Sequence, residues 1–178
     1  SFQIVTTVLL GLLLTPALAQ QFQNTQGNQQ FGIEGGYQFL NMNWEWREAT
    51  VEEKSTRGSW KTVWNYDTGF IATRVLPERA CFISTMNRNE MPRFDALPRL
   101  VEERRRLNGQ GRPAREITFD LVRRPVRNLK SYGAEIFNMC RGLATYMAYQ
   151  VRGAQSIINQ ESCIRLDVLQ VLGLNYCR

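Results

Sequence analysis

The stretch that decides the fold reads WKTVWNYDTGFIATRV, residues 60–75. Its two ends, Trp60–Asn65 and Phe70–Val75, are rich in aromatic and β-branched residues, which favour strands. Residues 66–69, Tyr-Asp-Thr-Gly, have the composition of a tight turn with a glycine near its end. A further turn leads to Ala80–Met86, which has the composition of a third strand. The sequence therefore predicts a three-stranded antiparallel meander.

Beyond this meander the periodicity changes. Residues 94–107 carry apolar side chains at helical spacing, and Pro98 suits the first turn of that helix. Glu116–Leu121 alternates strictly, with its apolar residues on one face, which is typical of a half-buried strand. A second helix is predicted over 125–140 and a last strand over 145–149. The order βββαβαβ indicates an α+β fold.

The N-terminal part resembles a secretory signal followed by a polar segment. Residues 1–19 carry no charge, and their short apolar run leads through a proline to Ala17-Leu18-Ala19, which predicts cleavage after Ala19. That run is shorter than the ~20 residues of a membrane span. The polar segment covers 20–54 and begins with a Gln/Asn-rich stretch over 20–43. Two interpretations stay open for this stretch: a flexible polar tail, or a β-prone segment that self-associates.

Composition excludes several kinds of site. The chain of 178 residues has 22 Lys and Arg against 16 Asp and Glu, a net charge of +6, and no histidine. Without histidine, Ser-His-Asp and Cys-His sites and zinc sites of the Cys/His type are impossible. The adjacent carboxylates Glu52-Glu53 and Glu102-Glu103 point apart on a strand or helix. We therefore expect a protein that is not an enzyme, with no metal site and no cofactor.

The even number of cysteines favours disulfides if the chain enters an oxidising compartment. The cysteines are Cys81, Cys140, Cys163 and Cys177. Four cysteines allow three pairings, which the sequence leaves open. A bridge between the last two would bring residues separated by roughly 46–50 Å of extended chain to a Cα distance below about 7 Å. The chain would then have to bend near Gln170 or Gly173.

Several blocks resemble the gastrokines, secreted gastric proteins that carry a BRICHOS domain. The blocks are SWKTVWNYDTGF (59–70), IATRVL (71–76), MNRNEMP (86–92) and NMCRGLATYMA (138–148). The last block contains the specific pattern C-R-G-x-x-T-Y-M. We assign residues 55–150 to the BRICHOS domain and 151–178 to a C-terminal segment. The resemblance is closer to the antral, mitogenic gastrokine than to the one that pairs with a trefoil peptide.

The resemblance implies a BRICHOS-type antiparallel sheet of about five strands flanked by two helices, and the pairings Cys81–Cys140 and Cys163–Cys177. The second bridge would close a β-prone C-terminal segment. The family usually has an Asp sixteen residues before the first BRICHOS cysteine, and this position is Asn65 here. Because Asn cannot take up a proton as the pH falls, we expect any acid-triggered rearrangement through this position to be lost.

The resemblance also implies a secreted extracellular factor, released through secretory granules, that promotes growth and protection of the gastric epithelium. Its expected partners are an epithelial receptor and β-prone peptides or proteins, the first of which would be its own Cys163–Cys177 segment. Because no cysteine precedes Cys81, we expect no covalent trefoil partner. The alternative functions are a purely structural or chaperone protein of mucus, or a binder of sulfated glycans, without receptor signalling.

Aromatic side chains on the predicted sheet are candidates for binding a β-prone segment by strand addition. They are Trp60, Trp64, Phe70, Phe82, Phe119 and Tyr146. The alternative interpretation is that they pack as core under the two helices.

Basic residues suggest a separate, electrostatic interaction. One group comprises Arg104, Arg105, Arg106, Arg112 and Arg115, and a second comprises Arg123, Arg124, Arg127 and Lys130. Such groups can hold mucin, sulfated glycans or anionic membranes, or form an ordinary solvated surface. Nucleic acid is not an expected partner of a secreted protein.

Overall fold

The computed structural model describes residues 28–107, 111–152 and 162–178. These residues form one ten-stranded sheet with the order β1-β2-β3-β4-β5-β6-β8-β7-β10-β9. The strands are β1 (Gln29–Ile33), β2 (Gly36–Asn43), β3 (Glu48–Ser55), β4 (Gly58–Asn65), β5 (Phe70–Val75), β6 (Ala80–Thr85), β7 (Arg115–Pro125), β8 (Ala144–Gln150), β9 (Ile164–Val168) and β10 (Leu172–Cys177). Among the described residues, no helix has the length and apolar character to cross a membrane.

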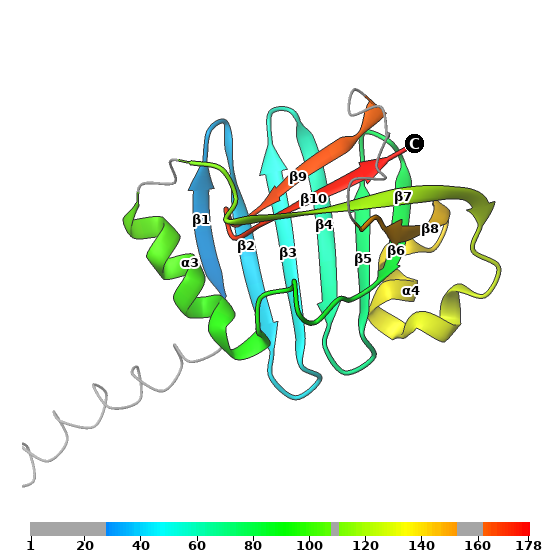
Figure 1. Ribbon diagram of the computed structural model, residues 1–178, viewed down its shortest axis with the longest axis horizontal. Coiled ribbons are helices and arrows are strands. Elements are labelled where there is room, and N and C mark those ends of the chain that lie inside the picture. Colours follow the sequence, from blue (N-terminus) through cyan, green and yellow to red (C-terminus); the bar gives the residue numbers. More distant parts are fainter. Residues whose placement is uncertain (1–27, 108–110, 153–161) are drawn as a thin grey trace, which may run out of the picture.

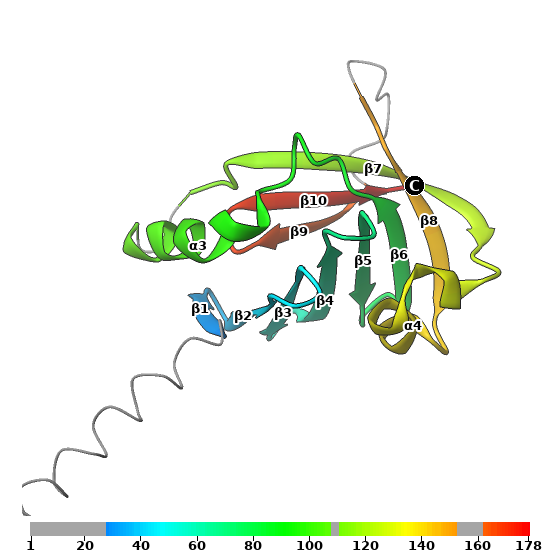
Figure 2. The same ribbon diagram turned by 90° about the horizontal axis from the view of Figure 1, so that it is seen from below.

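The sheet curls until its two halves face each other (Figures 1 and 2). Strands β1–β6 form an antiparallel meander in one layer, and β7, β10 and β9 cross over it in a second layer, with β8 joining the two at one end. Two of the joins are parallel, β6 with β8 and β7 with β10. We call the side of the meander that the second layer covers the concave face, and the opposite side the convex face.

Two short helices cover different faces of the sheet. Helix α3 (Leu97–Arg106), preceded by the 3-10 turn η2 (Phe94–Ala96), lies beside β1 and buries Leu97 and Val101 in the concave core. Helix α4 (Ala134–Cys140), preceded by η3 (Leu129–Tyr132), packs on the convex face. The helix predicted around Pro98 is confirmed, with Pro98 in its first turn.

Side chains alternate between the two faces along the central strands, so these strands contribute to a hydrophobic core on the concave face and to another on the convex face. On β4, Trp60 and Trp64 point into the concave core, whereas Val63 packs on the convex side against the residues of α4. β10 contributes Leu174 and Tyr176 to the concave core. A strand that is covered on both faces has few positions for polar residues, which explains why β6, buried from Ala80 to Ser84, reads as a nearly continuous apolar run.

The predicted fold class is wrong in the number, direction and covering of the strands. The order βββαβαβ does occur from β4 to β8, but three strands precede it and two follow it, which makes ten strands rather than about five. The two parallel joins make the sheet mixed, and the helices cover separate faces instead of flanking one small sheet. A parallel pair of strands joins segments that are distant in the sequence, so no local sequence pattern predicts it.

Of the two interpretations of the N-terminal stretch, the flexible tail is wrong for residues 29–33 and 36–43, which form β1 and β2. Phe31, Gln38, Leu40 and Met42 point inward, and the residues between them are less buried. This period of two is sufficient for a strand even though the segment is rich in Gln and Asn. The self-association of the alternative interpretation stays a prediction, as do the domain boundaries. The predicted signal, residues 1–19, lies outside the described residues.

The second helix is much shorter than predicted. Strand β7 continues to Pro125, where the helix was expected to begin. Gly133 then separates η3 from α4, with a φ of 106° that a regular helix does not allow. The apolar stripe of this region therefore belongs to a 3-10 turn and a helix of seven residues in succession.

Candidate functional site

The C-terminal hairpin, β9 and β10, lies across the concave face (Figure 1). In register, Tyr176 of β10 stands opposite Phe119 of β7 on one side and Ile164 of β9 on the other. The chain reverses at Leu169-Gln170, where both φ angles are 57°, so the bend predicted near Gln170 is confirmed. The Cys163–Cys177 disulfide closes the open end of the hairpin with a Cα separation of 4.1 Å.

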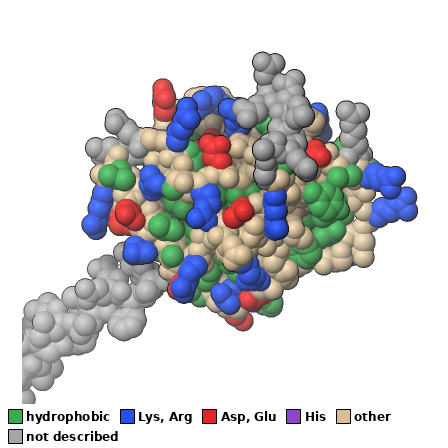
Figure 3. Space-filling model, in the orientation of Figure 1, with side chains coloured by type: hydrophobic (Ala, Val, Ile, Leu, Met, Phe, Trp, Pro, Cys, Tyr) green, Lys and Arg blue, Asp and Glu red, His purple; other side chains and the backbone are tan. Residues whose placement is uncertain are grey.

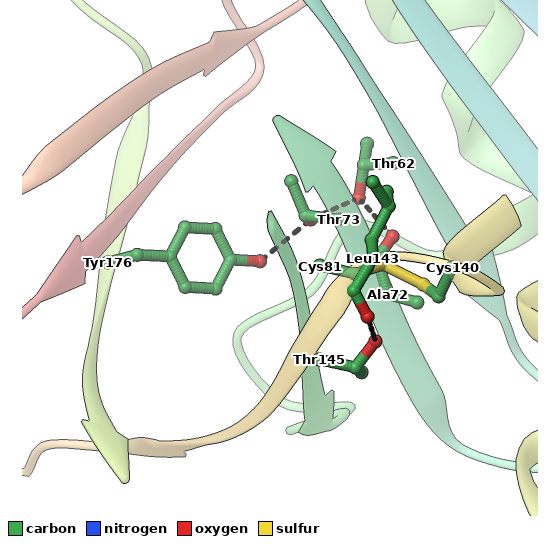
Figure 4. Close-up of a disulfide and its surroundings, with 8 residues drawn as sticks. All are labelled: Thr62, Ala72, Thr73, Cys81, Cys140, Leu143, Thr145 and Tyr176. Atoms are coloured by element: carbon green, nitrogen blue, oxygen red, sulfur yellow. Dashed lines mark hydrogen bonds between the residues drawn. A yellow bond between two sulfur atoms is a disulfide. The ribbon is translucent and has the colours of Figure 1, made fainter. Parts of the chain in front are cut away.

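Tyr176 fixes the position of this hairpin on the face. Its ring lies 4.9 Å from that of Phe82 and 5.2 Å from that of Phe119, with interplanar angles of 29° and 15°. Its hydroxyl lies 2.8 Å from Thr73 Oγ1, which lies 2.9 Å from Thr62 Oγ1 (Figure 4). Burial raises the pKa of the phenol, so the hydroxyl remains neutral. The stack and the hydrogen bonds together set the depth at which β10 lies.

The turn of the hairpin is held by Gln38 of β2, whose side chain is 2% exposed. Gln38 Oε1 accepts the backbone N–H of Leu169 at 2.7 Å. Its Nε2 donates to the carbonyl oxygen of Asp167 at 2.6 Å and to the Glu53 carboxylate at 2.7 Å. The amide thus joins the N-terminal strands to the hairpin, and a buried amide that lost these partners would be costly.

Asp167 is the titratable group of this contact. Its Oδ1 accepts the backbone N–H of Gln170 at 2.9 Å. Burial raises the pKa of the Asp167 carboxyl, and Glu53 and Glu116 act in the same direction, against the lowering effects of the Gln170 hydrogen bond and of Arg104. Compared with a solvent-exposed aspartate, the Asp167 carboxyl beside the hairpin turn is therefore shifted toward its protonated form.

A groove runs beside β9, which among the described strands has a neighbour on one side only. The groove has a volume of about 450 Å³ and lies between β9 and the adjoining ends of β3, β4 and β5. Trp60 and Leu166 supply apolar lining, and Glu53 and Asp167 supply polar lining. A groove with apolar lining next to an edge strand is a place where an extended segment can bind.

The six aromatic residues predicted to bind a segment do not all share one face. Five of them belong to or pack against the concave core: Trp60, Trp64, Phe82, Phe119 and Tyr146. Phe70 lies on the convex side, where its ring is 4.9 Å from that of Tyr132. Of the six, Trp60 lines the groove beside β9. The concave group is thus in contact with the chain's own C-terminal hairpin or next to it.

Gln38, Glu53 and Asp167 were not among the predicted site residues. The available signal was the alternation Gln38-x-Leu40-x-Met42, which places a polar side chain at an inward position where it needs a partner. The partner could not be found in the same way, because Asp167 is separated from Gln38 by 129 residues.

Asn65, at the position where the family usually has Asp, ends β4. Its Nδ2 donates to Glu48 Oε2 at 3.1 Å, and its Oδ1 accepts the backbone N–H groups of Asp67 at 3.1 Å and Thr68 at 2.8 Å. Asp67 lies in the turn. Burial raises the pKa of Glu48, and the hydrogen bond from Asn65 opposes that shift. A carboxyl group that can take up a proton therefore lies directly opposite Asn65 on the neighbouring strand.

The Cys81–Cys140 disulfide joins β6 to the end of α4, with a Cα separation of 5.6 Å (Figure 4). Both cysteines are buried in the convex core with Val63 and Ile83. Both pairings that the family resemblance implied are thus present.

The arginines of the predicted basic patch do not share one set of contacts. Arg105 and Arg106 pair with Glu102, while Arg115 donates to two backbone carbonyls in the loop before α3. Arg112 is exposed at the start of the next segment. In the second basic group, Lys130 lies 5.6 Å from the centre of the Phe137 ring, and the side chain of Arg123 lies outside the described part. Several of these charges therefore support the fold.

Comparison with known proteins identifies the class and then the family. Residues 56–147, more than half of the chain, match the BRICHOS domain. Gastrokine-1 of Homo sapiens is 32% identical and that of Sus scrofa 34%, each over 99% of this chain and 96% of the relative. Gastrokine-2 of Rattus norvegicus is 27% identical over 72% of this chain and 71% of the relative. No solved structure matches. The chain belongs to the gastrokine family, and it is closer to these gastrokine-1 proteins than to that gastrokine-2.

Proposed function

We propose that this protein is a secreted mucosal factor whose concave face binds β-prone segments and keeps them from aggregating. One observation carries the proposal: the face already binds a β-hairpin, through the ladder with β7, the stack at Tyr176 and the contacts of Gln38. Backbone ladders recognise any extended segment, and side-chain pockets select among them. A foreign β-prone segment can therefore use the same chemistry.

The groove beside β9 is the proposed entry. An arriving segment lies in this groove alongside β9 and contacts Trp60 and Leu166. A strand that displaces the hairpin also gains the aromatic surface of Phe82 and Phe119. Binding in both cases uses burial and hydrogen bonds without covalent chemistry, in keeping with a proposed binding protein that is neither an enzyme nor dependent on a cofactor.

The test uses the full chain with Gln38→Ala, which removes the contacts that hold the hairpin turn. The loss of buried hydrogen bonds should raise the undocked fraction of the hairpin about tenfold, the equivalent of about 1.4 kcal/mol. Suppression of fibril formation by an amyloid-forming peptide, followed by thioflavin fluorescence, should then be stronger than with the original protein. Asn41→Ala, an exposed change on the same strand, is the control. A folded Gln38→Ala protein with unchanged or weaker suppression would contradict the proposal.

Deleting residues 152–178 would also expose the concave face, but it is a less specific test of the proposal than Gln38→Ala. Leu172, Leu174 and Tyr176 belong to the core, so the deletion removes part of the fold along with the proposed competitor. The Gln38→Ala variant changes the docking contact and leaves the core side chains in place.

Secretion and growth promotion are part of the proposal. Two disulfides suit an oxidising compartment, and residues 1–19 have the composition of a signal. The promotion of epithelial growth through a receptor is supported by membership of the gastrokine family. Pure protein should increase proliferation of gastric epithelial cells with dose, and protein with scrambled disulfides should not. Equal responses to both preparations would contradict a receptor that recognises the folded chain.

A further inference from the structure

A second pocket, which we call the strand-end pocket, lies where the β2–β3 and β4–β5 turns meet the loop before α3. It has a volume of about 500 Å³ and is lined by Trp44, Arg47, Tyr66, Arg88, Pro92, Arg93, Phe94 and Asp95. It shares no residue with the groove beside β9 and lies at the other end of the strands. Lys and Arg side chains gather along this lower edge in Figure 3.

A row of aromatic rings leads from the core to the surface of the pocket. Phe94 is buried and packs edge-on against Tyr66 at 5.4 Å and against Trp44 at 4.9 Å. Trp44 is 51% exposed even though the buried Phe94 ring packs against it. An exposed indole that is fixed by a buried neighbour offers a flat apolar face at little cost in conformational entropy. Trp46, in the same turn and 62% exposed, is outside the pocket lining.

Three arginines line the same pocket. Arg47 has a φ of 44°, an uncommon value for a residue with a side chain, and its carbonyl is held by the backbone N–H of Tyr66 at 3.0 Å. Arg88 donates to the carbonyl of Tyr66, and Arg93 donates to the two oxygens of Asp95 at 3.2 Å and 2.9 Å. These bonds use one donor of Arg88 and two of Arg93, of the five that each guanidinium carries. The lining thus holds three cations and one carboxylate.

We propose that the strand-end pocket binds a sulfated sugar. The Trp44 ring takes the apolar C–H face of the sugar, the Asp95 carboxylate accepts a hydroxyl hydrogen, and the arginines hold the sulfate. Planar guanidinium groups suit the oxygens of such an anion, because they can donate two parallel hydrogen bonds. The mixture of a flat ring, an acceptor and cations matches a ligand that presents a ring face, hydroxyl groups and negative charge.

A peptide fits the pocket less well. The lining backbone lies in turns and a loop, so an extended chain would not find a strand beside which to pair. The proposed site also differs from the arginines around α3, two of which are paired with Glu102.

The experiment measures binding of a heparin-derived oligosaccharide to the full chain by calorimetry, with its desulfated form as the second probe. Trp44→Ala and Arg93→Gln should each weaken binding of the sulfated probe about tenfold or more, since a hydrogen bond to a charged group contributes about one such factor. The matched controls are Trp46→Ala, an exposed tryptophan of the same turn, and Arg106→Gln, an equal loss of charge on α3. Both should bind within about twofold of the original protein, because neither residue lines the pocket.

Three results would overturn the proposal. Equal losses in Trp44→Ala and Trp46→Ala, or in Arg93→Gln and Arg106→Gln, would mean that binding depends on general exposure or net charge. Equal affinity for the sulfated and desulfated probes would show that the sulfate group does not contribute to binding. Tighter binding of a sulfotyrosine peptide than of the oligosaccharide would assign the pocket to a peptide. Thermal unfolding of each variant verifies that it is folded, and the fibril assay verifies that the concave face is unaffected.

Discussion

At the scale of single residues, Asn65 and Glu48 form a pair across β3 and β4. Asn65 uses its amide N–H to donate to Glu48 and its amide oxygen to close the β4–β5 turn, so both ends of the side chain are used. An aspartate at this position could keep the turn but could not donate to Glu48 when ionised. The carboxyl that responds to acid is thus supplied by the facing strand rather than by residue 65.

We expect Asn65→Asp to lower the free energy of unfolding by about 1–2 kcal/mol at neutral pH, because it removes a donor and places two carboxylates face to face. The loss should shrink at pH 4, where one of the two carboxyls takes up a proton. Chemical denaturation at both pH values measures this. Asn128→Asp, an equal change of charge at an exposed position, should show a much smaller difference. An equal loss at both pH values would show that the facing carboxylates are not the cause.

At the scale of elements, the C-terminal hairpin is held at three separate places. The Cys163–Cys177 bridge closes its open end, Tyr176 fixes its middle, and Gln38 holds its turn. The three contacts differ in kind, so each can be removed without deleting the others. The other disulfide lies on the convex face and serves a different packing unit.

Replacing the hairpin disulfide with Cys163→Ser and Cys177→Ala should lower the free energy of unfolding by about 3 kcal/mol, the chain-entropy value for a loop of this length. Amide hydrogen exchange in β9 and β10 should accelerate more than exchange in β4 and β5. The matched control, Cys81→Ala with Cys140→Ala, opens a longer loop and should cost about 4 kcal/mol by the same formula. A hairpin whose exchange is as slow as before would show that the bridge does not contribute to its docking.

At the scale of the whole molecule, two partly buried carboxyls, Glu48 and Asp167, determine the direction in which stability changes with pH. The folded-state pKa values of Glu48 and Asp167 are raised above their ordinary values of 4.5 and 3.8, chiefly by burial. The folded protein therefore binds more protons than the unfolded chain in this range. The stabilisation is complete below the ordinary values and is lost as the pH rises through the raised folded-state values.

We accordingly expect the melting temperature to rise as the pH falls from neutral toward about 4.5, the upper of the two ordinary values. The double variant Glu48→Gln with Asp167→Asn should be more stable than the original protein at neutral pH, because it removes two partly buried charges and keeps their acceptor oxygens. Its melting temperature should depend less on pH across this range. A double variant with the same pH dependence as the original protein would assign the response to other groups.

The sequence was most informative where contacts are local. The strands and turns around Trp60–Val75 and the helix at Pro98 follow from period and turn chemistry, and they are confirmed. The parallel joins of β6 with β8 and of β7 with β10 could not be inferred from periodicity, because each pairs segments about 60 residues apart. Strands β1 and β2 have the Gln/Asn-rich composition of a polar tail, and only the alternation of inward residues such as Leu40 and Met42 indicates a strand. Gln38 is an inward position whose partner is specified only by the folded sheet.

The C-terminal hairpin belongs to the same molecule as the face it covers. A tethered segment of this kind competes at an effective concentration on the order of millimolar, whatever the concentration of the protein. Dilution therefore slows the arrival of a foreign strand and leaves the return of the hairpin unchanged. Sparse or weakly binding segments would lose this competition, and a segment would have to be abundant or unusually adhesive to occupy the face. The covered sheet would act as a threshold that spares ordinary extended chains.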